Sequence, residues 1–298
     1  MLSLLIAAML GVGHAAWAQL PAPNAEDMGE VFPKAPYSPF AGRDFPTQPL
    51  WGDTHLHTGL SMDAGAFGAR LMPDDAYKFA RGKEIVSSTG KRVRLARPLD
   101  FLVVADHSDN MGFFPRLFAG DPELLRDETG RRWYDMIQQG GQEGVKVAVE
   151  VIERFSDGTF PEALASLPGS SAYRSAWKQT MDAAEDANTP GRFTAFIGWE
   201  WTSNTMGNNL HRVLIYRDGA DKAGRLEPYT TLKPLGSDNP VDLWKWMQGY
   251  EDATGGDILA IAHNGNLSNG IMFPVVDSFS RKKIGKTYAK TRARWEPL

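Results

Sequence analysis

The chain has 298 residues, 42% of them hydrophobic, and a formal net charge of −4. This length and composition suit one large domain or two small ones, and the charge gives no indication of a nucleic-acid-binding protein. The sequence contains no cysteine, which excludes disulfides and thiolate metal sites. Any metal must therefore be bound by His, Asp, Glu, Asn or water.

The first 18 residues differ in composition from the rest of the chain. An apolar run over residues 4–12 is followed by small residues and by Ala-Trp-Ala at 16–18, which has the pattern of a cleavage site. The run is shorter than the roughly 20 residues of a membrane span. We expect a signal peptide over 1–18, a periplasmic or secreted protein, and no membrane span after cleavage. The usual basic start is missing, because no Lys or Arg precedes Lys34, and a buried N-terminal helix is the alternative.

Seven prolines fall between residues 19 and 49. Proline fixes φ and removes a backbone donor, so this segment is expected to be an extended arm and not a strand or helix. The folded domain is expected to cover residues 50–298.

Five short apolar runs in this domain have the character of strands buried on both faces. They cover residues 50–58, 98–108, 192–202, 211–217 and 257–266. Helices are expected over 72–82, which has Pro73 near its start, and over 239–256, which stops at a pair of glycines. This alternation predicts an α/β fold with a largely parallel sheet, open or closed into a barrel.

Residues 109–191 interrupt this alternation, because they are polar and favour helix over a long stretch. We expect a helical insertion between two core strands. Such an insertion either caps a site or is a plain surface elaboration.

Five of the six histidines lie at or near the ends of the predicted strands. They are His55, His57, His107, His211 and His263. Because parallel strands gather their carboxyl ends at one edge, these rings are expected to converge on a shared metal site. The His-x-His pair points both rings the same way, because side chains alternate along a strand. His211 stands at the start of its strand and must reach the site from the preceding loop.

Carboxylates accompany these histidines, and each has a structural alternative to metal binding. Asp63 could close a turn, and Asp106 could hold a histidine ring in place. Glu200 lies between Trp199 and Trp201 in an apolar run. Burying its carboxylate there without a cation or hydrogen bonds would be costly, so a metal role is favoured. Imidazole and carboxylate ligands suit Zn, Mn or Fe.

The motifs "GDTHLHT", "VVADHSD", "GWEW" and "AHNGN", in this order, resemble the polymerase-and-histidinol-phosphatase (PHP) superfamily. More narrowly, the opening motif, the helix "PDDAYKFARG" and "ADHSD" resemble a PHP-like bacterial family known mainly as a domain of unknown function. The resemblance runs from about residue 50 to the end of the chain. It implies a distorted (β/α) TIM-like barrel that holds two or three divalent ions.

The resemblance also implies roles for individual residues. The implied metal ligands are His55, His57, Asp63, His107, Glu200, His211 and His263. Asp106 and Asp53 correspond to positions that support a ligand or transfer a proton, and we assign Asp106 the catalytic role. Asn264 has no ligand counterpart.

One departure concerns a late Asp-x-His pair of the superfamily, since no histidine follows His263. Five strands are also too few for such a barrel. We expect the sequence to be the N-terminal part of a longer protein, with a shorter variant that has an incomplete metal set as the alternative. The basic run 280–294, with seven Lys or Arg and no acid, is interpreted as a solvated helix face and not as a nucleic-acid site.

These patterns together predict a metal-dependent hydrolase. A metal-activated water would attack a small anionic substrate, with phosphoester hydrolysis as the first interpretation. Arg70 and Lys78 are candidates for holding the anion. Hydrolysis of another ester, an amide or a sulfate remains open, as does a non-catalytic metal-binding fragment.

Overall fold

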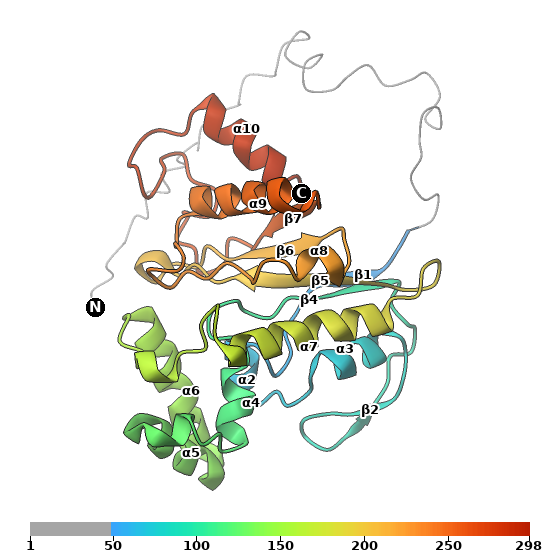
Figure 1. The fold of residues 1–298 in the computed structure, drawn as a ribbon, viewed down its shortest axis with the longest axis vertical. Helices are drawn as coiled ribbons and strands as arrows, with labels where there is room; N and C mark the ends of the chain where they lie inside the picture. Colours follow the sequence, from blue (N-terminus) through green and yellow to red (C-terminus); the bar gives the residue numbers. More distant parts are fainter. Residues whose placement is uncertain (1–48) are drawn as a thin grey trace, which may run out of the picture. The chain divides into compact units, whose positions relative to one another are not determined.

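A five-stranded sheet organises the part of the protein that the computed structural model describes, residues 49–298 (Figure 1). All five predicted strands are present in it, in the order β1-β4-β5-β6-β7. Their bounds are Gly52–Leu56 (β1), Phe101–Val104 (β4), Thr194–Trp201 (β5), Arg212–Tyr216 (β6) and Ile258–Ala262 (β7). The predicted signal peptide (1–18) and the predicted arm (19–49, apart from Pro49) lie outside the described residues.

The sheet is mixed, which corrects the expectation of a largely parallel one. β1, β4 and β5 are parallel, whereas β6 is antiparallel to both β5 and β7. The reason is the short connection between β5 and β6, since a parallel neighbour needs a crossover of a dozen or more residues. The amino end of β6 therefore lies at the same edge as the carboxyl ends of the other four strands.

The TIM-like barrel is not confirmed. The described residues form a curled, open sheet in which β1 and β7 are the two edge strands (Figure 1). The supported fold class is thus mixed α/β. A two-stranded hairpin outside this sheet was not expected, and it pairs β2 (Ile85–Val86) with β3 (Arg92–Val93).

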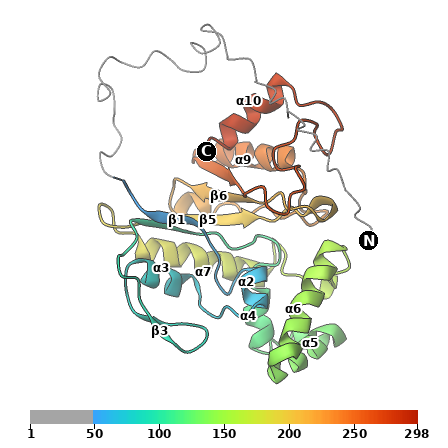
Figure 2. The same ribbon diagram turned by 180° about the vertical axis from the view of Figure 1, so that it is seen from behind.

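The helices of the main core wrap around one face of the curled sheet (Figures 1 and 2). α3 (Pro73–Ala80) and α7 (Ser171–Ala187) pack beside β4 and β5, and α9 (Pro240–Thr254) and α10 (Lys286–Trp295) pack beside β7. Tyr216 of β6 contacts both α7 and α9, whereas the opposite face of the sheet carries a small separate cluster around Val103 and Val213. The helices at 72–82 and 239–256 match the prediction. Local sequence explains their ends, since α3 and α9 begin with proline and α9 stops at Gly255, which has φ of 61°. The short helix α8 (Ala220–Ala223) follows β6.

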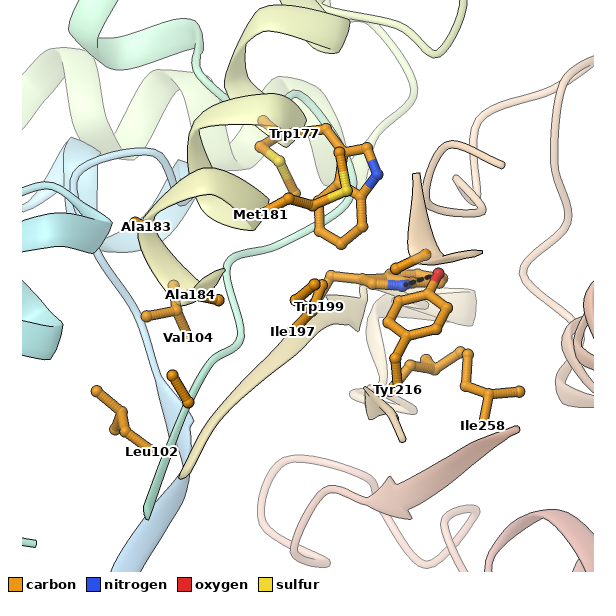
Figure 3. Close-up of a cluster of buried hydrophobic side chains, with 14 of the residues drawn as sticks. Leu102, Val104, Trp177, Met181, Ala183, Ala184, Ile197, Trp199, Tyr216 and Ile258 are labelled. Atoms are coloured by element: carbon orange, nitrogen blue, oxygen red, sulfur yellow. Dashed lines mark hydrogen bonds between the residues drawn. The ribbon is translucent and has the colours of Figure 1, made fainter. Parts of the chain in front are cut away.

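The main core lies between the sheet and helices α3, α7 and α9, and Figure 3 shows its part beside α7. Trp177 and Met181 of α7 pack toward Trp199 of β5, whose indole Nε1 donates a hydrogen bond of 3.1 Å to the Tyr216 hydroxyl. Gly198 precedes this tryptophan, and a Cβ there would lie 2.4 Å from a methyl group of Val103. The strand that carries Glu200 is therefore held tightly on both sides.

A second apolar cluster lies in helices away from the sheet (Figure 2). Its helices are α2 (Met62–Ala66), α4 (Phe113–Phe118), α5 (Glu128–Gln139) and α6 (Gly141–Ser156). Phe113, Phe114 and Trp133 are its largest fully buried side chains. Within the predicted insertion 109–191, α4 to α6 build this cluster, whereas α7 packs on the sheet. No helix within residues 49–298 is long and apolar enough to cross a membrane.

Candidate metal centre

The predicted site side chains come together at one edge of the sheet. The residues and their positions are His55 in β1, His57 after β1, His107 after β4, Glu200 in β5, His211 before β6 and His263 after β7. The antiparallel direction of β6 explains the place of His211, because the start of this strand lies at the edge where the other four strands end.

Glu200 is the centre of the cluster. Its side chain is 1% exposed, and ring nitrogens of four histidines lie within 3.5 Å of its carboxylate oxygens. These distances are 2.9 Å for His55 Nε2, 3.3 Å for His57 Nε2, 3.0 Å for His107 Nδ1 and 3.5 Å for His211 Nδ1. The rings stand edge to face, with centroids 4.7 Å apart for His57 and His107 and 5.0 Å for His107 and His211.

The Glu200 carboxylate and the imidazole rings lie close together, but their geometry does not give the Glu200 oxygens hydrogen bonds. Both carboxylate oxygens of Glu200 and Nε2 of His57 are buried, and none of them has a hydrogen-bond partner of proper geometry among the described residues. Buried polar atoms without partners are rare and costly. A divalent cation between the carboxylate and the imidazoles would satisfy them, so the residues present fit a metal site.

Three overlapping groups of side chains have ligand atoms close enough to hold an ion. They are His55-His57-Glu200, His57-Asp63-His107 and His107-Glu200-His211. Each group shares a member with the next, so neighbouring ions would share ligands. Nitrogen and oxygen ligands of this kind suit first-row divalent metals.

Asp63 is placed to serve two histidines. Its Oδ1 lies 3.0 Å from His57 Nδ1 and also accepts hydrogen bonds from the Ser61 hydroxyl and the Ala64 amide. Its Oδ2 lies 3.6 Å from His107 Nε2. Both carboxylate oxygens therefore lie within hydrogen-bond distance of His57 Nδ1, and Oδ2 also faces His107.

The electrostatics of the cluster favour a cation. Burial alone would lower the pKa of His57, but the carboxylates of Asp63 and Glu200 raise it to about 10. Burial alone would raise the pKa values of Glu200 and Asp63, but the surrounding histidines hold both well below their usual range. The carboxylates are thus ionised and attract positive charge into the cluster.

Hydrogen bonds to neighbouring side chains determine which ring nitrogen of His107 and of His211 points into the cluster. The Thr202 hydroxyl donates to the Glu200 carbonyl and so accepts from His107 Nδ1, 2.9 Å away, which leaves Nε2 of His107 free toward Asp63. The Asn204 amide nitrogen donates to the Thr202 carbonyl, so its oxygen accepts from His211 Nε2 at 3.1 Å. His211 then presents Nδ1 toward Glu200. Burial lowers the pKa of His211 to about 4, so its ring is neutral.

Sequence reasoning missed these supporting residues. Thr202 and Asn204 follow β5 directly, and their only signal was their position beside "GWEW". Ser61 is fully buried, and its hydroxyl oxygen lies 3.2 Å from His57 Nδ1 and accepts from the His107 amide at 3.1 Å. Ser61 thus links the loops after β1 and β4.

The two other predicted aspartates, Asp53 and Asp106, accept hydrogen bonds from backbone amides near the cluster. Asp106 is buried, and its oxygens accept hydrogen bonds from the amide and the hydroxyl of Thr58. Burial raises its pKa, which makes the charged form dependent on these bonds. Asp53 accepts the His55 amide at 2.7 Å. The catalytic role of Asp106 stays a prediction, and its contacts here are those of a residue that positions the loop after β1.

His263 lies at the rim of the cluster. Its ring centroid is 5.1 Å from that of His55 and 5.7 Å from that of His211, but it belongs to none of the three close groups. Its Nδ1 donates to the Asn264 carbonyl at 3.1 Å, so Nε2 is the nitrogen it can offer to a ligand.

Arg70 and Lys78, suggested as anion-binding residues, have other contacts. The guanidinium of Arg70 lies over the Phe118 ring at 3.3 Å and donates to the carbonyls of Gly65 and Ala69. Lys78 pairs with Asp74 on the exposed side of α3. The structure gives neither a contact with the cluster.

The fold and the cluster define a mixed α/β protein with a candidate site for divalent metal ions. Residues 44–298 match the family model described as protein of unknown function (DUF3604), and because this match covers most of the chain, the chain belongs to that family. No curated protein and no solved structure matches the chain.

This match corrects the assignment to the PHP superfamily, which was wrong. The family model that matches is that of DUF3604, and none of the comparisons supports PHP. The physical reason is that His-x-His and Asp-His pairs at strand ends suit metal binding on many folds, so they indicate the chemistry of a site more than its family. The ligand assignments made through that resemblance now depend on the geometry alone.

Proposed function

We propose that this protein is a metal-dependent hydrolase whose cluster around Glu200 binds two or three divalent ions, with Zn, Mn and Fe as candidates. The observation that carries the proposal is the buried Glu200 carboxylate, which faces four imidazole nitrogens and has no hydrogen bond of its own. The overlap of the three ligand groups favours more than one ion.

When bound, such ions lower the pKa of a water ligand and polarise the oxygens of a substrate. The protein residues supply the rest. Glu200 neutralises positive charge in the buried part of the site. Thr202 and Asn204 hold His107 and His211 in fixed tautomers, and Ser61 and Asp63 hold His57. This preorganisation keeps the site geometry from relaxing during the reaction.

The exposed side of the cluster indicates where a substrate would approach. The side chains of His55 and Asp63 are 33% and 42% exposed, whereas that of Glu200 is 1% exposed. A small substrate would reach the ions from the side of His55 and Asp63. Its electrophilic centre would then lie next to the metal-facing histidines.

A small anionic molecule is the proposed substrate class, and phosphoesters are the first to test, because a pair of ions stabilises both the attacking and the leaving oxygen of a displacement. We also propose that the protein is exported, on the basis of its N-terminal sequence. Neither nucleic-acid binding nor a membrane-spanning segment in the mature protein forms part of the proposal.

The test is turnover of a generic phosphomonoester and a phosphodiester by the metal-loaded protein. Glu200→Gln and His57→Gln should lower kcat by at least 100-fold, whereas Glu143→Gln, on the surface of α6, should leave it unchanged. Turnover of amides or sulfates alone would replace the phosphoester assignment. Bound metal without turnover of any ester, amide or sulfate would contradict the hydrolase proposal.

A further inference from the structure

The segment between β7 and α10 exposes large apolar side chains. Phe273 is 65% exposed, Val275 80% and Val276 46%. Most exposed apolar residues need no explanation, but several together in one short segment mark a surface that another molecule covers.

This segment has a defined local structure. Val276 pairs with Lys283 in an antiparallel bridge, and the Ile284 amide donates to the Val275 carbonyl at 3.0 Å. The Asp277 carboxylate accepts the amides of the two residues that start the turn, 279 and 280. Directly opposite residues of such a pair place their side chains on the same face. An apolar side chain and a cation, Val276 and Lys283, are therefore displayed side by side.

Exposed cations lie in the turn that follows the apolar residues and in the first half of α10. They are Arg281, Lys282, Lys283, Lys286 and Lys290. Within residues 49–298 none of these five forms an ion pair with a carboxylate. By contrast, Arg292 of α10 pairs with Glu296 at the end of that helix, and Arg294 of α10 pairs with Glu251 of α9. The unpaired charges thus fall within residues 281–290, on a chain whose overall charge is −4.

We propose that this basic-apolar surface, formed by Phe273, Val275, Val276 and the five unpaired cations, binds peripherally to an anionic phospholipid bilayer. Each Lys or Arg near an anionic membrane surface contributes on the order of 1 kcal/mol, and apolar side chains beside them enter the headgroup boundary. This surface combines the electrostatic and the apolar contributions to membrane binding. Membrane binding would also give a function to the basic run 280–294, which takes no part in the candidate metal centre.

Nucleic acid fits the surface less well. Single-stranded nucleic acids need exposed aromatic faces for base stacking. Phe273 is the single aromatic residue among those that form this surface, and the guanidinium of Arg292 stacks over its ring, 4.7 Å from the centroid. The surface therefore offers no row of rings for successive bases. Exposed valines add nothing to phosphate recognition, whereas they add to lipid binding.

Co-sedimentation with vesicles tests the proposal. The unaltered chain should bind vesicles that contain phosphatidylglycerol and should bind pure phosphatidylcholine vesicles at least tenfold less. Lys282→Glu/Lys283→Glu/Lys286→Glu should lower binding to the anionic vesicles at least tenfold, and Val275→Ser/Val276→Ser should lower it severalfold. All proteins share the same N-terminal residues, so the differences between them report on this surface.

A charge-matched control is Lys83→Glu/Lys91→Glu/Arg94→Glu, which alters exposed cations around the β2–β3 hairpin. It should bind within twofold of the unaltered chain, and thermal melting should show that every variant is folded. Equal losses in the control and in the 282/283/286 variant, or no binding by the unaltered chain, would overturn the proposal. It would also fail if sedimentation velocity showed a dimer that this variant dissociates and the vesicles bound nothing, because the occupant would then be a second copy of the chain.

Discussion

The Nε2 atom of His55 in β1 lies 2.9 Å from the Oε1 atom of Glu200 in β5, across the intervening strand β4. The two residues are far apart in the sequence, and the parallel register of β1, β4 and β5 brings them together. The same edge receives His211 only because β6 runs in the opposite direction. The geometry of the cluster is thus set by the directions of the strands, which makes its properties open to test by substitutions in and around the sheet.

Asn204 should control metal affinity through His211. Its amide oxygen accepts from His211 Nε2, so Asn204→Ala frees the ring to rotate and to change tautomer. Loss of such a partner typically weakens metal binding by 10- to 100-fold. Titration with Zn²⁺ or Mn²⁺ should show this loss, whereas Asn208→Ala, which removes an amide bonded to loop carbonyls, should change affinity less than twofold. Equal affinity in the two variants would contradict this role.

Asp106 should matter first for stability. In Asp106→Asn the amide oxygen still accepts from the Thr58 amide and the new NH₂ group faces the Thr58 hydroxyl, so two hydrogen bonds to a charged carboxylate become weaker bonds to a neutral amide. We expect the free energy of unfolding to fall by about 1–3 kcal/mol. Urea unfolding measures this change. If turnover disappeared while stability stayed the same, Asp106 would instead have the catalytic role predicted from the sequence.

The pair of Arg212 and Glu296 should be a strong structural contact. Both side chains are almost completely buried, and Glu296 also accepts the Trp244 indole N–H at 3.0 Å. Glu296→Gln leaves the buried charge of Arg212 unbalanced, so we expect a loss of about 3–5 kcal/mol in unfolding free energy. The matched control is Glu251→Gln, which breaks a pair with the half-exposed Arg294 and should cost less than about 1 kcal/mol. Similar losses for the two glutamates would refute the distinction.

Glu150 should give α5 and α6 a pH-dependent contact. Arg132 donates two hydrogen bonds to Glu150 and, against a smaller opposing effect of burial, lowers its pKa to about 2. A pKa below the unfolded value of about 4.3 means that this contact stabilises the fold above that pH and is lost as pH falls toward 2. Glu150→Gln should lower unfolding free energy by up to about 1 kcal/mol at pH 7, because the group is partly solvated. This difference should shrink between pH 5 and pH 2.5, and a constant difference would contradict the assignment.

Much of the site was predictable because strand-end chemistry is local in sequence. His55, His57, His107 and Glu200 each follow or end an apolar run, and the convergence of such ends is a general property of α/β sheets. The direction of β6 was not predictable from its own pattern, because buried strands look alike in either direction. The sequence placed His211 in the site through the loop before its strand, and the structure added that the reversed direction of β6 brings it there.

The supporting residues escaped prediction for a different reason. Ser61, Thr202 and Asn204 are common loop residues, and only their hydrogen bonds to histidines distinguish them. The strand pattern left an open sheet and a barrel as alternatives, and the TIM-like barrel was chosen through a resemblance. The family match to DUF3604 does not support that resemblance, and the described sheet is open.

Metal content tests the central claim most directly. The chain would be dialysed against Zn²⁺, Mn²⁺ or Fe²⁺, and the bound metal would be counted by elemental analysis, for the unaltered protein, for Glu200→Gln and for the surface variant Glu143→Gln. We predict at least two ions per unaltered chain with one of these metals, the same number for Glu143→Gln, and fewer than one for Glu200→Gln. Less than one ion per unaltered chain with all three metals, or an undiminished number in Glu200→Gln, would contradict a metal centre built on Glu200.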